Sequence, residues 1–235
     1  MQRRLILPIA TAALLSAAAA PAATRGFSVT SFDRIRLEGP FAVTLTTGAG
    51  ASARADGPDQ RMLERVRIDV MGRTLVIRRD RDTTSGGTLK GIRIALSTPA
   101  LSGASVLGAG SLTVAANRGA RFDATVSGAG ALAVTGLDTD LLNVTSTGAG
   151  STTLAGRARN LRAVMQGTGT IDAPTLIAQD AVVTTAGSGT LTLTAVRTAK
   201  VGATGGGLVT ILGTPACTVT SEGTVEVVCE GPKRR

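Results

Sequence analysis

Gly108-Ala109-Gly110, Gly128-Ala129-Gly130 and Gly148-Ala149-Gly150 follow one another at a constant step along the chain. The pattern continues at nearly the same step with Gly167-Thr168-Gly169, Gly187-Ser188-Gly189 and Gly205-Gly206-Gly207. A nearly fixed period of about 20 residues is typical of repeat architectures. Gly223 continues the series after Gly205 but is followed by Val225 instead of a second glycine, as expected for an atypical terminal repeat.

Apolar residues alternate with small or polar ones on both sides of each glycine pair. Four and six residues after the first glycine lie two apolar columns, Leu112, Leu132, Thr152, Ile171, Leu191, Val209 and Val227, then Val114, Val134, Leu154, Ala173, Leu193, Ile211 and Cys229. Equivalent positions before successive glycine pairs are also mostly apolar: Phe122, Ala124 and Val126, then Leu142, Val144 and Ser146, then Leu161, Ala163 and Met165. A period of two predicts strands with one buried face. Each rung is therefore predicted to be strand, glycine corner, strand and loop, stacked into a parallel β-solenoid.

The corners require glycine because the chain turns there at positive φ or passes close to the rung beside it. The predicted structural corners are Gly108, Gly110, Gly128, Gly130, Gly148, Gly150, Gly167, Gly169, Gly187, Gly189, Gly205 and Gly207. Residues 27–98 lack this ladder.

The chain begins with a segment typical of export. Arg3 and Arg4 precede an apolar run over 5–20, and Ala20-Pro21-Ala22 is a small-x-small cleavage pattern. We expect a cleaved signal peptide over 1–22 and an exported protein, periplasmic, cell-surface or secreted. No later stretch is long and apolar enough to span a bilayer. A single domain is expected over 23–231, less regular over 27–98 and regular over 99–231, before a basic tail over 232–235.

Strand signals also occur in the less regular part. Residues 35–45 are expected to form strand, turn and strand around Glu38-Gly39-Pro40, and a second strand pair is expected around Met71-Gly72-Arg73. A short helix is expected over 58–64, a mobile loop over 80–88, and a further strand over 92–96.

Charge is distributed unevenly along the chain. Removal of Arg3 and Arg4 leaves 23 basic and 16 acidic residues, a net charge of +7. Residues 27–98 hold 12 basic and 8 acidic residues, whereas 108–230 hold 7 and 8. The chain has no Trp, no Tyr and four Phe, so it lacks the aromatic platforms typical of nucleic-acid readers. No specific nucleic-acid partner is expected.

In its order of motifs, this chain resembles the head GIN domain family, described as putative auto-transporter adhesin heads. The resemblance rests on Glu38-Gly39-Pro40-Phe41, the strand pair around Gly72, the strand closing on Pro99, and the Gly-Ala-Gly corners. It implies an exported bacterial protein and an all-β, right-handed, single-stranded parallel β-helix, with rungs of about 20 residues here. Met71-Gly72-Arg73 departs from the acidic or Asn-Gly turn more usual in the family.

Few residue types remain for chemistry. The absence of histidine excludes catalytic triads and imidazole metal sites, and no cofactor or metal ligand set is expected. Asp138 and Asp140 form an Asp-x-Asp pair in a predicted inter-rung loop, with Ala158 and Ile177 at the expected stacked positions, and Asp172 and Asp180 follow near later loops. A solvated loop explains such isolated carboxylates better than a catalytic pair does.

The two cysteines are predicted to form a disulfide. Cys217 lies six residues before Gly223 and Cys229 six residues after it, which places both in inward columns on opposite arms of the last rung. Since packed sheets lie about 10 Å apart and disulfide Cα atoms within about 7 Å, the arms have to converge there.

Two functions remain open. The first is an exported cell-envelope binding or scaffold module, adhesin-head-like, that acts by surface contact rather than catalysis, with a glycan or cell-envelope polymer as the partner class considered. The alternative is a polysaccharide-active β-helix enzyme that uses loop carboxylates. A flat face without a pocket favours the first, and an acidic cluster in a groove the second.

Overall fold

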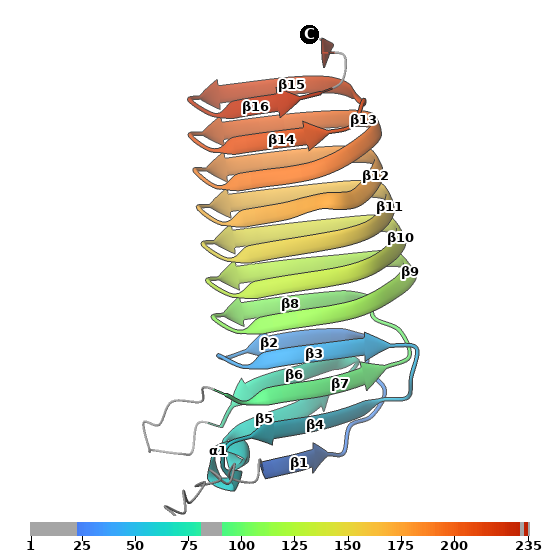
Figure 1. Ribbon diagram of the computed structural model, residues 1–235, viewed down its shortest axis with the longest axis vertical. Coiled ribbons are helices and arrows are strands. Elements are labelled where there is room, and N and C mark those ends of the chain that lie inside the picture. Colours follow the sequence, from blue (N-terminus) through green and yellow to red (C-terminus); the bar gives the residue numbers. More distant parts are fainter. Residues whose placement is uncertain (1–22, 81–90, 231–232, 235) are drawn as a thin grey trace, which may run out of the picture.

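The protein is an elongated β-solenoid (Figure 1). The computed structural model describes residues 23–80, 91–230 and 233–234. The predicted signal peptide over 1–22 and most of the predicted loop, residues 81–88, lie outside the described residues. The fold class predicted from the glycine period is confirmed.

The regular rungs stack in sequence order. Equivalent residues pair in parallel, so that Leu132 lies between Leu112 and Thr152. The strands of this region are β9 (Ser111–Gly128), β10 (Ala131–Gly148), β11 (Ser151–Gly167), β12 (Thr170–Gly187), β13 (Thr190–Gly205), β14 (Leu208–Leu212), β15 (Ala216–Gly223), β16 (Glu226–Cys229) and β17 (Lys233–Arg234). β17 shows that part of the predicted basic tail pairs in parallel with β15.

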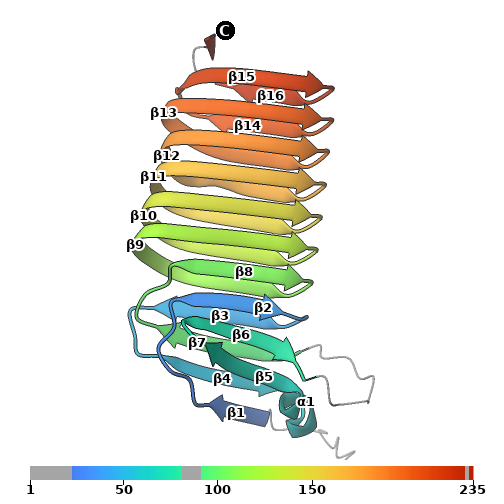
Figure 2. The same ribbon diagram turned by 180° about the vertical axis from the view of Figure 1, so that it is seen from behind.

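Each of the strands β9 to β13 belongs to both walls of the solenoid. We call the wall formed after each glycine corner sheet 1 and the wall formed before each corner sheet 2; Figures 1 and 2 show them from opposite sides. The predicted loop, which would lead from sheet 1 to sheet 2 opposite the glycine corners, is absent from these rungs. Each strand instead continues around the side opposite the corners, with ladder pairing and local register shifts. We call this side the rounded edge.

The core is a narrow aliphatic layer between the two sheets. Residues of the predicted inward columns are buried, including Leu132, Val134, Leu142 and Val144, except that Val227 in the last rung is partly exposed. Phe122 fills the same layer in the first regular rung. Alternation with a period of two therefore located the core correctly.

The corner glycines lie in register at the tight edge. Gly128 pairs with Gly108 on one side and Gly148 on the other, and its φ is +107°. A Cβ atom on Gly128 would lie 2.9 Å from the carbonyl oxygen of Gly108. Since Ala129 N also donates to that carbonyl at 3.0 Å, the rung below cannot move aside without losing a hydrogen bond.

The N-terminal rungs do not stack in sequence order. The rung formed by β2 and β3 lies between the later rungs β6–β7 and β8–β9. The strands are β2 (Arg34–Glu38), β3 (Ala42–Thr47), β6 (Thr74–Arg79), β7 (Arg93–Thr98) and β8 (Gly103–Gly108). The glycine ladder also begins earlier than the sequence analysis indicated: Gly39, with φ +134°, forms the corner beneath Gly110.

Antiparallel strands and a helix cover the N-terminal end. β4 (Ser52–Gly57) pairs antiparallel with β7, β1 (Ala23–Phe27) pairs antiparallel with β4, and β5 (Val66–Met71) forms the predicted hairpin with β6. The predicted helix is α1 (Gln60–Glu64), shorter than expected because Asp59 is its N-cap and accepts from Arg61 N at 3.1 Å.

Candidate binding surfaces

The outer face of sheet 1 consists mainly of small hydroxyl and methyl side chains. Residues that alternate with the buried columns of β3 and of β9 to β13 point outward from this sheet. We call their surface the threonine-rich face; it comprises Ala42, Thr44, Thr46, Ser111, Thr113, Ala115, Ala131, Ala133, Thr135, Ser151, Thr153, Ala155, Thr170, Asp172, Thr190, Thr192 and Thr194.

Ladder pairing arranges this face in columns. Thr44 pairs with Thr113, and Thr113 with Ala133, so that equivalent side chains follow one another about 4.8 Å apart across the sheet. Asp172, at the paired position between Thr153 and Thr192, is the one charged residue of the face as defined. The threonine-rich face is therefore a flat, nearly neutral array of hydroxyl and methyl groups.

Asp138 and Asp140 do not lie in a loop. Both point outward from β10 at the rounded edge, on either side of Thr139, whose side chain is buried. The paired positions of Asp138 are Arg118 and Arg157 rather than Ala158, which pairs with Thr139. The prediction was wrong by one position because the step from Gly148 to Gly167 is one residue shorter than the step from Gly128 to Gly148.

Each of the two carboxylates has its own arginine. Arg157 Nη2 lies 3.7 Å from Asp138 Oδ2, and Arg159 Nε lies 3.5 Å from Asp140 Oδ1. All four side chains are more than half exposed, at 52–75%. They line a depression of about 370 Å³ together with Gly119, Thr139, Ala158, Ile177 and Gln179. The depression has balanced charge and is not an acidic groove.

Asp180 is held by the next rung. Arg197 Nε donates to Asp180 Oδ1 at 3.0 Å and Arg197 Nη2 donates to Oδ2, while Thr198 Oγ1 donates to Oδ1 at 2.6 Å. The hydrogen bonds from Arg197, then that from Thr198, lower the pKa of Asp180 below its ordinary value and keep the carboxylate ionised. Asp138 and Asp140 share one depression, whereas Asp172 lies on sheet 1 and Asp180 is held by Arg197 and Thr198. The structure therefore does not bring the four predicted acidic residues into one site.

Sheet 2 carries a cluster that the sequence analysis missed. Arg121 Nε donates to both oxygens of Asp123 at 3.0 Å, and Asn143 Nδ2 donates to Asp123 Oδ1 at 2.8 Å. Asn143 pairs in register with Asp123 and with Arg162, and these residues line a second depression of about 370 Å³. The available signal was that Asp123 and Asn143 are separated by the same step as Gly128 and Gly148.

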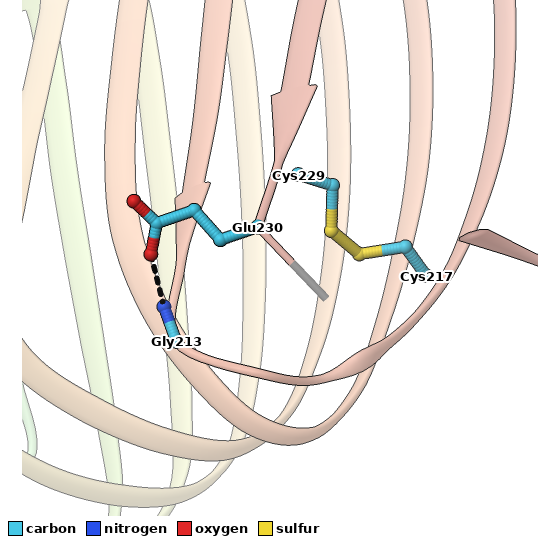
Figure 3. The surroundings of a disulfide bond; sticks show 4 residues. All are labelled: Gly213, Cys217, Cys229 and Glu230. Atoms are coloured by element: carbon cyan, nitrogen blue, oxygen red, sulfur yellow. Dashed lines mark hydrogen bonds between the residues drawn. A yellow bond between two sulfur atoms is a disulfide. The ribbon is translucent and has the colours of Figure 1, made fainter. Parts of the chain in front are cut away.

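The predicted disulfide between Cys217 and Cys229 is present (Figure 3). Its Cα atoms are 6.8 Å apart, so the two walls converge at the last rung, and both cysteines are buried. Next to it, Gly213 N donates to Glu230 Oε2 at 3.1 Å. Among residues 23–80 and 91–230, no three acidic or cysteine side chains gather as a metal site would require.

One family model matches the chain over residues 31–215, and its description is "Putative auto-transporter adhesin, head GIN domain". No curated protein sequence matches the chain. Within the described residues, no helix has the length and hydropathy needed to cross a membrane.

Solved structures share the fold. A crystal structure described as a "putative adhesin" from Bacteroides fragilis is 22% identical, with a TM-score of 0.80, and covers 89% of this chain and 97% of its own. A "putative lipid binding protein" from Parabacteroides distasonis is 16% identical, with a TM-score of 0.71, covering 88% and 96%. A "putative adhesin" from Parabacteroides merdae is 17% identical, with a TM-score of 0.65, covering 88% and 95%. At these identities the likeness establishes the fold alone.

Proposed function

The chain belongs to the head GIN domain family, and from this premise we propose that it is an exported cell-envelope module that binds or scaffolds by surface contact. The observation that carries the proposal is the threonine-rich face, which is a flat wall of short side chains presented by a continuous parallel sheet. Short side chains lose little rotamer freedom when a partner covers them.

The partner class that fits this face is an extended, hydroxyl-rich polymer such as a glycan of the cell envelope. Threonine and serine hydroxyls donate and accept hydrogen bonds, as sugar hydroxyls do, and the columns repeat them about every 4.8 Å. Alanine positions such as Ala131 and Ala133 leave room for a polymer chain to approach the sheet. With no Trp or Tyr in the chain, binding at each rung is weak, and affinity accumulates over several rungs.

The second candidate, a polysaccharide-active enzyme, would use Asp138 and Asp140 beside their depression. A catalytic carboxylate has to be free to act on its substrate, whereas each of these two carboxylates faces an arginine. We therefore place catalysis second. Turnover of a polyuronate or another glycan that disappears in Asp138→Asn or Asp140→Asn would reverse this order.

Export is part of the proposal and rests on the sequence of residues 1–22. We expect the processed protein to begin near Ala23. Amino-terminal sequencing of the protein recovered from periplasmic, surface and culture fractions tests both the cleavage and the location. Full-length protein retaining Met1 in the cytoplasm would contradict it.

The binding test is a glycan array together with pull-down on isolated envelope polymers. The variant Thr113→Lys, Thr153→Lys, Thr192→Lys places three long charged side chains in the central column of the threonine-rich face. The matched control, Thr125→Lys, Thr145→Lys, Thr184→Lys, makes the same substitutions at outward positions of sheet 2. We expect the first variant alone to lose polymer binding. Equal binding by both variants would contradict the assignment of the face.

Salt dependence distinguishes electrostatic attraction from contacts made by the threonine-rich face. The basic excess of residues 27–98 adds a general attraction to anionic polymers, which is screened over about 8 Å at 0.15 M salt. Contacts of the neutral face persist at that salt concentration. Loss of all binding between low and physiological salt would assign the interaction to the basic residues instead of the face.

A further inference from the structure

The hydrophobic core is incompletely covered at both ends of the solenoid. At the C-terminal end, Val219 and Val227 are partly exposed, although Val201 and Val209, their partners on the rung below, are each only 1% exposed. At the N-terminal end, Ala23, Phe27 and Met62 pack against the core while remaining partly exposed. Solenoids generally need a terminal cap with a polar outer surface, and here both ends retain apolar groups.

The edge strands of sheet 1 are open at these same ends. Among the described strands, β16 pairs only with β14, and β1 pairs only with β4. Glu226 N donates to Gly207 O at 3.0 Å and Glu230 N to Ile211 O at 3.2 Å, so alternate residues of β16 face β14. The intervening residues, Val227 and Cys229, consequently direct their N–H and C=O groups away from the solenoid.

The two open strands run in the same direction. β1 is antiparallel to β4, β4 is antiparallel to β7, and every later pairing in sheet 1 is parallel. β1 is therefore parallel to β16, as Figure 1 shows. If a second copy is translated along the solenoid axis, its β1 can continue the parallel ladder that ends at β16.

Charge favours contact between opposite ends over contact between like ends. On the two edge strands themselves, β16 and the residue that follows it carry Glu226 and Glu230, whereas β1 carries Arg25. Two β16 edges paired antiparallel around Val228 would place Glu226 opposite Glu230, and like charges in this arrangement repel. Lys233 and Arg234 extend sheet 2 on β15 and leave β16 uncovered.

We propose that this protein assembles head to tail, with the β16 edge of one copy paired in parallel with the β1 edge of a second copy. The contact is heterologous, so it extends into linear arrays instead of closing into a dimer. Because β1 and β16 both belong to sheet 1, the array continues this wall from copy to copy. The proposal concerns assembly and stands whether or not the threonine-rich face binds a polymer.

The test uses protein that begins at Ala23 and ends at Arg235. Light scattering after size exclusion, from about 1 µM to 1 mM, is expected to show mass increasing in steps of one protomer, with less association at high salt. Val227→Pro removes an outward N–H without removing a bond to β14, and weakens association at least about 10-fold. Val227→Ala is its control for lost packing and continues to assemble.

A mixing experiment identifies the ends in contact. A folded tag fused directly to Ala23 covers the β1 edge, so tagged protein alone stays monomeric. An equimolar mixture of tagged protein and Val227→Pro forms a 1:1 dimer and nothing larger, because each partner retains one intact end. If Val227→Pro fails to fold, excess tagged protein added to the unmodified protein is expected to shorten its arrays.

Three results would overturn the proposal. One is a monomer at every concentration up to about 1 mM. Another is self-association of tagged protein, which would indicate contact between two C-terminal ends. The third is self-association of folded Val227→Pro at the strength of the unmodified protein, which would indicate contact between N-terminal ends or lateral faces.

Discussion

The regular rungs and the N-terminal rungs build the same two-walled core by different routes. From β9 to β13, each rung pairs with the rung that follows it in sequence, and one corner geometry is repeated. In the N-terminal part, β1 lies at the end of the stack and the chain then forms the rung β2–β3. It goes back to the end of the stack through β4 and β5, and returns through β6 and β7 before crossing to β8. Stacking order and sequence order are therefore separable.

Comparison of the two regions shows where backbone contact constrains the sequence. From Gly128 onward, the first glycine of each regular corner combines positive φ with close contact to the corner beneath it, whereas the second glycine, such as Gly130, excludes a side chain by contact alone. Gly108 has φ +98°, but among the described residues beyond its chain neighbours no atom lies within 4 Å of the Cβ it would acquire. The two regions therefore differ at the first glycine of the corner, whereas at the second glycine a Cβ on Gly110 would meet Gly39 O just as later second glycines meet the corner beneath them.

A pair of glycine substitutions tests this distinction directly. Gly148→Ala has to adopt φ +105° and places Cβ 2.7 Å from Gly128 O, so strain and backbone displacement add to about 3–4 kcal/mol. Gly108→Ala has the strain alone and is expected to cost about 1–2 kcal/mol. Chemical denaturation of both variants measures the difference. Equal costs would show that close contact does not distinguish the regular corners.

A second prediction contrasts the two ends. Strands and α1 cover the N-terminal end, whereas the Cys217–Cys229 disulfide joins the walls at the C-terminal end. Because the two cysteines are 12 residues apart, we predict that removing the bond lowers the unfolding free energy by roughly 3 kcal/mol. We expect the double variant Cys217→Ser, Cys229→Ser to show this loss and the unmodified protein to match it in reductant.

Hydrogen exchange shows which part of the solenoid loses stability when the disulfide is removed. Amides of β15 and β16 are expected to exchange faster in the double variant, while amides of β4 to β7 retain their protection. Detection of two free thiols in the exported protein, or uniform loss of protection along the chain, would contradict the assignment of the disulfide as an end clamp.

A third prediction concerns β9, which joins the two regions. Asn117 on β9 is 1% exposed, and both polar atoms of its side-chain amide lack a hydrogen-bond partner within the part of the chain that the structure describes. Leu137 occupies the paired position on β10. Asn117→Leu removes two unsatisfied polar groups with little change in shape, so we expect the unfolding free energy to increase by about 1–2 kcal/mol.

The matched control is Asn143→Leu, which removes a surface hydrogen bond to Asp123 and is expected not to stabilise. Thermal melting and denaturant titration of the two variants give the comparison. Destabilisation by Asn117→Leu would show that its amide has a partner, such as an enclosed water, and that the junction between the regions is polar by requirement.

The glycine period and the alternation of apolar residues predicted the regular region because each rung contacts its sequence neighbours. Leu132 and Val134 could be assigned to the core from their spacing to Gly128 alone. The same reasoning predicted a turn at Gly39 but not its place in the glycine ladder, since Gly110, which stacks on it, lies several rungs away along the chain and no period connects the two.

The surface was harder to predict than the core because it depends on register to a single residue. Arg157, and not Ala158, pairs with Asp138, since one rung is a residue shorter than its neighbours. That difference changes an isolated carboxylate into a member of an ion pair. The disulfide was predictable because Cys217 and Cys229 lie at equal distances from the last corner, at Gly223.

The last prediction concerns the pH dependence of stability and compares two similar carboxylate clusters, one in each region. In the N-terminal region, Thr24 Oγ1 donates to Asp56 Oδ1 at 2.6 Å and Arg54 Nε donates at 3.0 Å. In the regular region, Arg197 and Thr198 donate to Asp180. The pKa of Asp56 is lowered mainly by the Thr24 hydrogen bond and further by Arg54, and that of Asp180 mainly by Arg197 and further by Thr198.

A carboxylate with a lowered pKa in the folded protein stabilises it above the ordinary value of 3.8, and this contribution is lost as the pH falls through the lowered pKa. Both side chains are partly exposed to solvent, so the effects are small. We expect Asp180→Asn and Asp56→Asn to be slightly less stable than the unmodified protein at pH 7 and to lose less stability between pH 5 and pH 2. Denaturant titrations across this range give the profiles.

Because Thr24 lies on the edge strand β1 and Asp180 within the regular stack, we further expect Asp56→Asn to increase hydrogen exchange of β1 amides alone, whereas Asp180→Asn lowers the global unfolding free energy. Acid profiles that match the unmodified protein in both variants would show that neither cluster is linked to folding.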